Sequence, residues 1–314
     1  MIAAFEYCGL GVSATIVLPE LDALESDRSI DLRVVIPERT LPRPESWVHH
    51  WVGSSGITLS LGRVDGRHVL RFEDGSFFDF DPDTRTIGLL TPRKEAVRRQ
   101  LLDHVLPRVF DHLGNLMIHG SAINTRSGSV VFIGDSGHGK STLAASFQNS
   151  GVDLLSDDCV RLTNDSCGGV DCMPTYRSLR LWPDSAASVM SCPSFELISS
   201  DSDKHRLHLS AKSAIDPGKV AVIFVLATPS DGVAIRFSPL PPAQAVSHLL
   251  AQCFRLDPTD ADATKRAFER CADVAERVPV VELSYPRDYD RLSEVREAVL
   301  DRSASGDWAT ITAR

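Results

Sequence analysis

The stretch 129–147, with the sequence SVVFIGDSGHGKSTLAASF, constrains the fold of this chain more than any other feature. Its apolar and β-branched start, 130–133, is typical of a buried strand. The pattern Gly134-x4-Gly139-Lys140-Ser141 follows at once and is a complete phosphate-binding loop of the Walker A type. A strand, a glycine-rich turn and a helix in this order predict an α/β nucleotide-binding domain.

The residues of this loop have distinct expected roles. Backbone N–H groups of the loop and the positive end of the helix dipole converge on phosphate oxygens. Lys140 is expected to reach the β- and γ-phosphates, and the Ser141 hydroxyl is expected to ligate Mg²⁺. We therefore predict ATP and Mg²⁺ as cofactors. The expected nucleotide contacts are Gly134, Asp135, Ser136, Gly137, His138, Gly139, Lys140, Ser141 and Thr142.

Composition excludes several other classes of protein. The chain has 314 residues, of which 43% are hydrophobic and 24% charged, as in ordinary globular proteins. A formal charge of −9 argues against non-specific binding of nucleic acid or anionic membranes, because nothing offsets phosphate repulsion. The N-terminus is a poor signal peptide, and no apolar run is long enough to span a membrane. Seven scattered cysteines indicate reduced thiols and a cytoplasmic protein.

Hydrophobic periodicity divides the chain into four parts. Residues 1–92 alternate in the manner of strands and predict a small antiparallel β domain. Residues 93–115 follow a helical pattern that we expect to link two domains, with a kink or break at Pro107. Strands and helices alternate over 116–302, which predicts the nucleotide-binding domain. The last residues, 303–314, are expected to be a flexible tail.

Two adjacent carboxylates, Asp157 and Asp158, follow the expected strand 152–156 one helix after the loop. A Walker-type site requires an acidic residue at the end of a neighbouring strand to hold Mg²⁺. One carboxylate is expected to ligate the metal while the other accepts the proton of an attacking hydroxyl. The alternative is a turn that closes a hairpin between strands 152–156 and 159–163.

Further charged side chains are candidates for the same site. Pairing of the strand after His119 with 130–133 is expected to carry this histidine toward the phosphates. Arg180 is expected to neutralise charge on the transferring phosphoryl group, since guanidinium suits phosphate oxygens. Arg177, Lys204 and Arg206 are weaker candidates, with surface solvation as the alternative.

Taken together, these residues resemble the bacterial HPr kinase/phosphorylase family. The resemblance covers His119-Gly120, the loop, and the Asp157–Asp158 pair, with similar spacings. It implies a P-loop kinase domain related in fold to phosphoenolpyruvate carboxykinase, with a smaller N-terminal β domain. Catalytic roles are implied for Asp157 as base, for His119, and for Lys140, with Asp158 and Ser141 as metal ligands. The family's hexamers imply a homo-oligomer.

Other segments are similar to HPr-kinase homologues encoded beside lasso-peptide precursors. They are 7–10, 18–21, 179–184 and 283–288. This resemblance implies a kinase of the precursor's C-terminal serine, with the N-terminal β domain as the natural peptide holder. Asp135 and Thr142 depart from the glutamates that HPr kinases usually carry there. Two other acceptors are possible for such a kinase: a carrier protein such as HPr, and a small hydroxyl compound. The alternative to a kinase is a non-catalytic nucleotide-binding switch.

Overall fold

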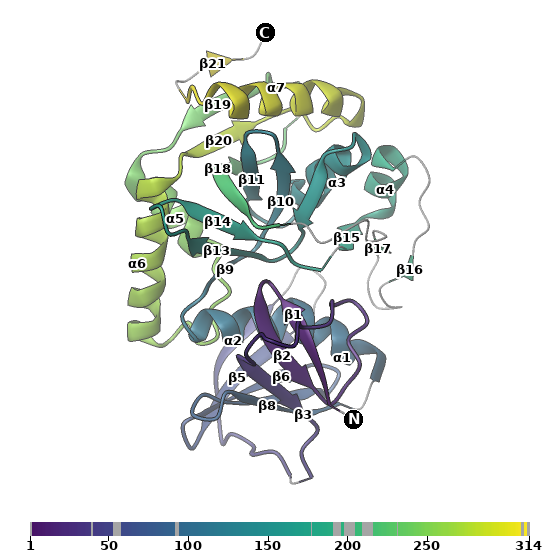
Figure 1. The fold of residues 1–314 in the computed structure, drawn as a ribbon, viewed down its shortest axis with the longest axis vertical. Helices are drawn as coiled ribbons and strands as arrows, with labels where there is room; N and C mark the ends of the chain where they lie inside the picture. Colours follow the sequence, from purple (N-terminus) through teal and green to yellow (C-terminus); the bar gives the residue numbers. More distant parts are fainter. Residues whose placement is uncertain are drawn as a thin grey trace. The chain divides into compact units, whose positions relative to one another are not determined.

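The computed structural model describes residues 2–38, 40–52, 58–91, 94–176, 178–190, 196–197, 205–208, 216–230, 232–308 and 311–312. The protein is a mixed α/β molecule with two large sheets (Figure 1). The chain forms two compact units. The first comprises Met1–Gly114 and Phe254–Lys265, and the second comprises Asn115–Cys253 and Arg266–Arg314.

An eight-stranded sheet forms the first unit. Its strands lie in the order β1-β2-β3-β8-β7-β6-β5-β4. The prediction of a purely antiparallel sheet is wrong at one strand, because β3 pairs in parallel with both β2 and β8. The strands are β1 (Ala3–Tyr7), β2 (Leu10–Ala14), β3 (Leu32–Val35), β4 (Trp47–Val52), β5 (Thr58–Val64), β6 (Arg67–Phe72), β7 (Phe77–Asp81) and β8 (Thr86–Leu90).

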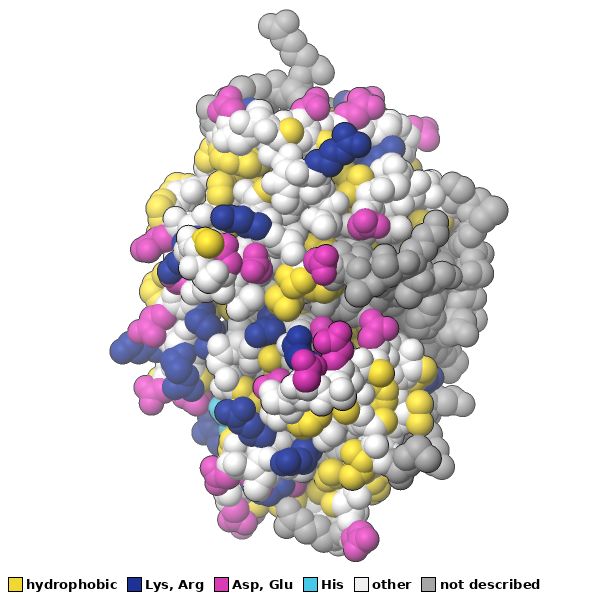
Figure 2. All heavy atoms as spheres, in the orientation of Figure 1, with side chains coloured by type: hydrophobic (Ala, Val, Ile, Leu, Met, Phe, Trp, Pro, Cys, Tyr) yellow, Lys and Arg dark blue, Asp and Glu magenta, His cyan; other side chains and the backbone are white. Residues whose placement is uncertain are grey.

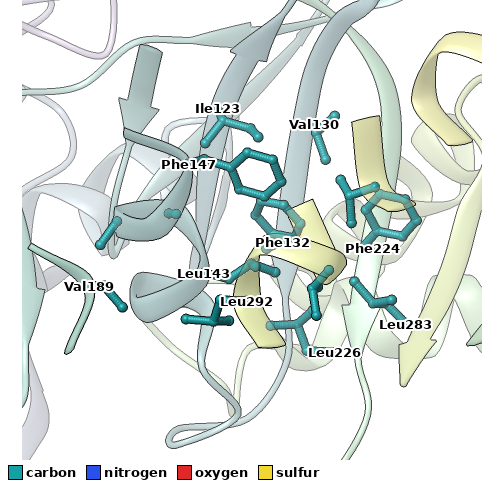
Figure 3. Packing of buried hydrophobic residues seen from close by; sticks show 14 of the residues in the cluster. Ile123, Val130, Phe132, Leu143, Phe147, Val189, Phe224, Leu226, Leu283 and Leu292 are labelled. Atoms are coloured by element: carbon teal, nitrogen blue, oxygen red, sulfur yellow. The ribbon is translucent and has the colours of Figure 1, made fainter. Parts of the chain in front are cut away.

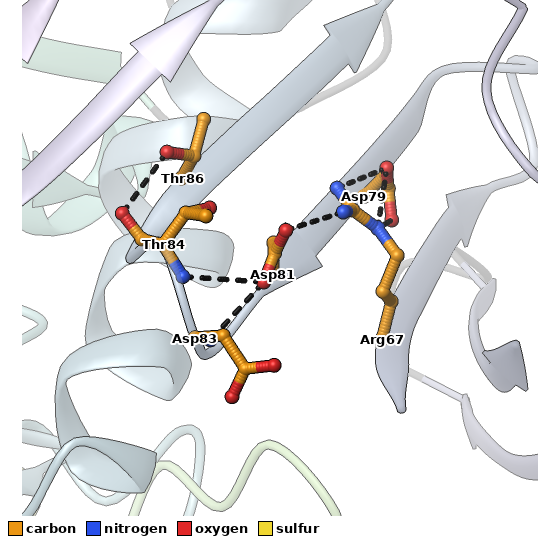
Figure 4. A network of polar contacts seen from close by, with 6 residues as sticks. All are labelled: Arg67, Asp79, Asp81, Asp83, Thr84 and Thr86. Carbon is orange, nitrogen blue, oxygen red and sulfur yellow. Dashed lines mark hydrogen bonds and ion pairs between the residues drawn. The ribbon is translucent and has the colours of Figure 1, made fainter. Parts of the chain in front are cut away.

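One buried ion-pair network joins two neighbouring strands of this sheet (Figure 4). Arg67 of β6 donates through Nε and Nη2 to Asp79 of β7, at 2.7 to 3.1 Å, and through Nη1 to Asp81 at 2.5 Å. Asp79 is fully buried, so the fork of Arg67 supplies the compensation that a buried carboxylate requires. This network therefore fixes the pairing of β6 with β7.

The helical segment after β8 was expected to be a linker between two domains. Instead, it belongs to the first unit. It contains α1 (Lys94–Gln100), a π-helical turn η1 (Leu101–Val105) and α2 (Leu106–His112). Pro107 has no N–H to donate to a carbonyl one turn earlier, which explains why the irregularity precedes it. Tyr7 donates its hydroxyl to the Leu102 carbonyl at 2.8 Å and thereby ties this turn to the sheet.

The second unit is built on a ten-stranded sheet around β11 and β18, which run in parallel. The path is β12-β10-β11-β18-β14-β13-β9, and β20, β19 and β21 extend it from β18. Its strands are β9 (Leu116–Ile118), β10 (Gly120–Thr125), β11 (Gly128–Ile133), β12 (Asp153–Ser156), β13 (Val160–Asn164), β14 (Val170–Met173), β18 (Gly218–Leu226), β19 (Arg236–Pro239), β20 (Val280–Ser284) and β21 (Ile311–Thr312).

The remaining elements flank this sheet or form a small sheet of their own. The helical ones are α3 (Lys140–Asn149), α4 (Pro183–Val189), α5 (Pro242–Ala251), α6 (Ala261–Arg277), the 3₁₀ turn η2 (Tyr289–Arg291) and α7 (Leu292–Ser305). The small sheet has the order β15-β17-β16, from β15 (Ser178–Leu181), β16 (Glu196–Leu197) and β17 (His205–His208).

Alternation along β11 explains why its sequence is apolar at every position. Val130 and Phe132 join a core shared with α3, α4 and α7, whereas Val131 and Ile133 join a core shared with α5 and α6. A strand covered on both faces needs apolar side chains throughout. In the first of these cores, Phe132 stacks on Phe147 and Phe224, with ring centroids 5.9 and 6.1 Å apart (Figure 3). These contacts hold the strand that enters the phosphate-binding loop.

Two further expectations from the sequence are wrong. The strands on either side of Asp157 do not form a hairpin, since β12 pairs with β10 whereas β13 pairs with β9 and β14. The C-terminal residues are not simply a tail, because α7 extends to Ser305 and β21 pairs with β19.

On the face drawn in Figure 2, basic and acidic side chains are interspersed. Within the described residues, no helix has the length and apolarity required to cross a membrane.

Candidate phosphate-binding site

The glycine-rich loop connects the buried end of β11 to the first turn of α3. Gly134, Gly137 and Gly139 have φ values of 144°, 87° and 90°, which side chains rarely allow. The N-cap residue of α3 is Gly139, which has no side chain to cap the helix. The loop thus leads directly into a helix N-terminus, the place where the motif predicts an anion.

Lys140 is the first residue of α3, and its side chain lies along the loop. Its Nζ donates to the carbonyl of Gly134 at 2.7 Å and to that of Asp135 at 3.0 Å. These bonds hold the ammonium group over the turn that the glycines form. A compact cation in this position is placed to balance phosphate charge.

Asp157 follows β12 and is buried, with 5% of its surface exposed. Its Oδ1 accepts a hydrogen bond from the Ser121 hydroxyl at 2.6 Å, and its Oδ2 accepts one from the Arg180 N–H at 3.1 Å. Burial, and then the neighbouring charge of Asp158, raise the pKa of Asp157 to about 6, whereas Ser121, the Arg180 backbone and Ser141 act to lower it. This carboxylate therefore lies in the electrostatic surroundings of the loop serine.

Asp158 turns away from this buried position. Its φ of 66° is left-handed, a conformation that aspartate tolerates better than most residues. Its Oδ2 lies 3.0 Å from Nε of Arg180 on β15. Its carbonyl lies 2.9 Å from Nδ1 of His119, which acts as the donor in this contact. Two side chains expected at the site, His119 and Arg180, are therefore held by one residue.

His119 reaches this position because of how β9 and β10 are arranged. The backbone N–H of His119 donates to the Gln252 carbonyl at 2.7 Å, and Gly120 pairs with Ile133, the last residue of β11. A Cβ at Gly120 would lie 2.8 Å from the Phe132 carbonyl oxygen, so glycine permits this close approach. The predicted placement of His119 beside the end of the loop strand is what the structure shows.

A cavity of about 310 Å³ unites these residues within the second unit. Of the expected nucleotide contacts, Ser136–Thr142 line it, whereas Gly134 and Asp135 lie outside the lining. Asp158, His119 and Arg180 line it as well. Asp157 is buried and is not among the lining residues. Arg177, Lys204 and the side chain of Arg206 lie outside the described residues.

Sequence reasoning missed one wall of the cavity as part of the site. This wall consists of Trp182, Asp184, Ser185, Pro229, Tyr285, Pro286, Arg287, Asp288, Tyr289 and Leu292. The segments 179–184 and 283–288 carried only a family resemblance, since no motif assigns chemistry to an isolated tyrosine or tryptophan. The position of 285–289 after β20 was the available signal, because β20 runs parallel to β18 and ligands of open α/β sheets bind beyond the carboxyl ends of strands.

The oxygen groups beside the loop suit a magnesium ion. Mg²⁺ prefers hard oxygen ligands and is bound through one or two carboxylates together with substrate phosphates. Ser141 and Asp158, which line the cavity, supply a hydroxyl and a carboxylate, and the neighbouring Asp157 supplies a second carboxylate. Among the described residues no cluster of three or more His, Cys, Asp or Glu side chains could hold a metal alone. The donor set therefore fits a metal that shares its ligands with a nucleotide.

Comparisons with known proteins leave the chain without an assigned family. No protein-family model matches the sequence, and no curated protein matches it significantly. Among solved structures it is similar to the Hpr(Ser) kinase/phosphatase from Coxiella burnetii, at 14% identity and a TM-score of 0.30. The match covers 59% of this chain and 97% of that one. A likeness this weak carries no weight in assigning a function.

Proposed function

We propose that this protein is an ATP- and Mg²⁺-dependent phosphotransferase that phosphorylates a serine hydroxyl. One observation carries the proposal: a single cavity is bordered by the phosphate-binding loop and by Asp158, His119 and Arg180. Phosphoryl transfer requires little from a protein beyond positioning and charge stabilisation. A loop for the phosphates, a carboxylate for the acceptor and cations for the transferring group are the parts it needs.

The loop side of the cavity holds the phosphates in this proposal. Backbone N–H groups of the loop and of the first turn of α3 bind phosphate oxygens, and Lys140 moves from the loop carbonyls to the terminal phosphates. Ser141 would hold the metal, with the buried Asp157 behind it on the metal side. When bound, Mg²⁺ neutralises the charge that accumulates on the β- and γ-phosphate oxygens.

Access decides which carboxylate meets the acceptor. The raised pKa of Asp157 suits a base, but a base must first lie within hydrogen-bond reach of the proton it removes. Asp157 is buried against Ser121 and Ser141, whereas Asp158 lines the cavity. We therefore exchange the roles expected from the resemblance: Asp158 accepts the hydroxyl proton, and Asp157 lies on the metal side.

These two roles separate experimentally. Asp158→Asn is expected to lower kcat at an unchanged Mg²⁺ requirement. Asp157→Asn is expected to raise the Mg²⁺ concentration that gives half-maximal activity. The reverse pattern would restore Asp157 as the base and Asp158 as the metal ligand.

His119 and Arg180 supply positive charge or hydrogen-bond donors on the acceptor side. Arg180 is held by the Asp158 carboxylate, and the Nδ1–H of His119 is held by the Asp158 carbonyl. His119 lines the cavity with its Nδ1 held in this way. Both side chains are thus oriented before substrate arrives, which is how charge stabilisation is most effective.

The acceptor is proposed from the resemblance described above. We favour the C-terminal serine of a ribosomal precursor peptide of the lasso class, phosphorylated in the cytoplasm. A carrier protein such as HPr and a small hydroxyl compound are the alternative acceptors.

Mass spectrometry distinguishes these acceptors. Peptides that end in serine are incubated with MgATP and the protein, beside peptides that end in alanine, an HPr protein and free serine. The proposal predicts a gain of one phosphoryl group on the serine peptides alone. Transfer to free serine at a comparable kcat/KM would instead favour a small-molecule kinase.

A further inference from the structure

One wall of the cavity is built from residues that phosphate binding does not require. After β20, the segment 285–289 lies against the loop: the Tyr285 hydroxyl donates to the His138 carbonyl at 3.2 Å. At the other end of this segment, the Tyr289 hydroxyl contacts Asp184 Oδ2 and Ser185 Oγ, each at 3.0 Å. Thr142, in the first turn of α3, donates to the same Ser185 oxygen at 3.3 Å.

These contacts fix an aromatic surface beside the phosphate-binding loop. Tyr289 is 40% exposed and Trp182 is 45% exposed, although both are large and line the cavity. The two bonds to the Tyr289 hydroxyl hold its ring in place without covering its face. Arg287, also on this wall, adds a guanidinium group. Flat aromatic and guanidinium faces suit a planar ligand such as a nucleobase. Phosphate groups are not planar and do not require such a surface.

The geometry of transfer determines which ligand belongs on this wall. The attacking and leaving oxygens of a phosphoryl transfer are roughly in line, so the acceptor and the nucleoside lie on opposite sides of the transferred group. Asp158, with Arg180 and His119, marks the acceptor side in the proposed function. The wall that contacts His138 and Thr142 borders the loop and the helix start instead, where the rest of the nucleotide continues.

We propose that Tyr289, with Arg287 and Trp182, forms the subsite for the base of the bound nucleoside triphosphate. Tyr285 is a positioning residue in this subsite, because it joins the segment to the loop. The inference rests on the proposed function for its orientation, since the acceptor side is assigned there. It adds to that function the residues that distinguish a nucleotide from a bare triphosphate.

Titration calorimetry with two ligands tests the subsite. Wild-type protein is titrated with MgATP and with magnesium triphosphate, which lacks the nucleoside. We expect ATP to bind more tightly. Stacking on one aromatic ring typically changes base affinity by about tenfold, so Tyr289→Ala is expected to weaken ATP about tenfold and leave triphosphate unchanged. Arg287→Ala is expected to act in the same direction.

Two variants control this experiment. Tyr289→Phe keeps the ring and loses the hydroxyl contacts, so it retains most of the affinity for ATP. Phe268→Ala removes a 51%-exposed aromatic side chain of α6 that does not line the cavity, and it is expected to change neither affinity. Circular dichroism of each variant establishes that it is folded.

Several results would overturn the subsite. For the wild type, these results are equal affinity for ATP and triphosphate, or no measurable binding of either. For Tyr289→Ala, they are equal weakening of both ligands, or a raised KM for the acceptor at unchanged ATP affinity. Failure of the proposed function gives a different result. A protein that binds ATP in the predicted pattern but phosphorylates nothing keeps the nucleoside subsite and loses the kinase assignment.

Discussion

Asp157→Asn is predicted to gain stability relative to wild type as the pH rises toward neutrality, although the substitution impairs the site. The pKa of Asp157 rises from an ordinary 3.8 to about 6 because the carboxyl group is buried beside Asp158. A tenfold change in proton affinity is worth roughly 1.4 kcal/mol, so this rise corresponds to about 3 kcal/mol. The folded state binds the proton more tightly than the unfolded state, and the wild type therefore loses stability as the pH rises from about 4 to about 6.

Asparagine lacks this titration and keeps the shape of the side chain. Its amide oxygen can accept from the Arg180 N–H, and its NH₂ can donate to the Ser121 hydroxyl oxygen. The free energy of unfolding of the variant, relative to wild type, is expected to increase by roughly 2 kcal/mol between pH 4 and pH 7.5, because part of the change lies below pH 4. The substitution can also change the free energy of unfolding by an amount that does not depend on pH, and this amount cancels when the two pH values are compared.

Urea unfolding at a series of pH values measures this difference. Asp153→Asn is the matched control, because Asp153 begins the same strand β12 at an exposed position. We expect its free energy of unfolding to follow that of wild type. Parallel curves for wild type and Asp157→Asn from pH 4 to 7.5 would refute the reasoning that burial of an ionised Asp157 is costly.

Three further substitutions test the loop, the site and the core. Gly139→Ala is expected to destabilise the protein by about 1–3 kcal/mol and to abolish ATP binding, because φ is 90° and the new Cβ would lie 2.5 Å from the Tyr285 hydroxyl. Gly151→Ala, with the same φ and no neighbour within 4 Å, is its control in thermal unfolding and should cost less. Arg180→Ala is expected to lower kcat about 10²- to 10³-fold in the peptide assay, with partial recovery in Arg180→Lys; an unchanged kcat would remove Arg180 from the site. Phe132→Ala should cost about 3–5 kcal/mol in urea unfolding, since its ring is fully buried, and a cost below 1 kcal/mol would contradict the packing.

Local patterns in the sequence predict the loop and its surroundings well. The strand before the loop, the glycine-rich turn and the helix after it depend on neighbouring residues, and the structure has them in the predicted order, with α3 beginning at Lys140, two residues before the expected Thr142. The placement of His119 was also predictable, because one antiparallel pairing determines it. These features require no knowledge of distant contacts.

Longer-range pairing was not predictable in the same way. The segment after Asp158 looks like the second strand of a hairpin, yet it pairs with β9 and β14, whose positions depend on the whole sheet. The parallel pairing of β3 in the first unit is equally non-local. The burial of Asp157 follows from contacts with Ser121, Ser141 and the Arg180 backbone, which come from three separate elements. Sequence alone showed two adjacent carboxylates and could not show that only one lines the cavity.

Transfer of label from γ-labelled ATP to a peptide ending in serine tests the central claim most directly. Wild type and Asp158→Asn are compared at saturating Mg²⁺, with ATP affinity measured on the same samples. We predict that wild type labels the peptide. Asp158→Asn should bind ATP equally well and transfer at least about a hundredfold more slowly. Wild-type protein that binds ATP but labels no hydroxyl acceptor, or an Asp158→Asn variant as fast as wild type, would contradict this account.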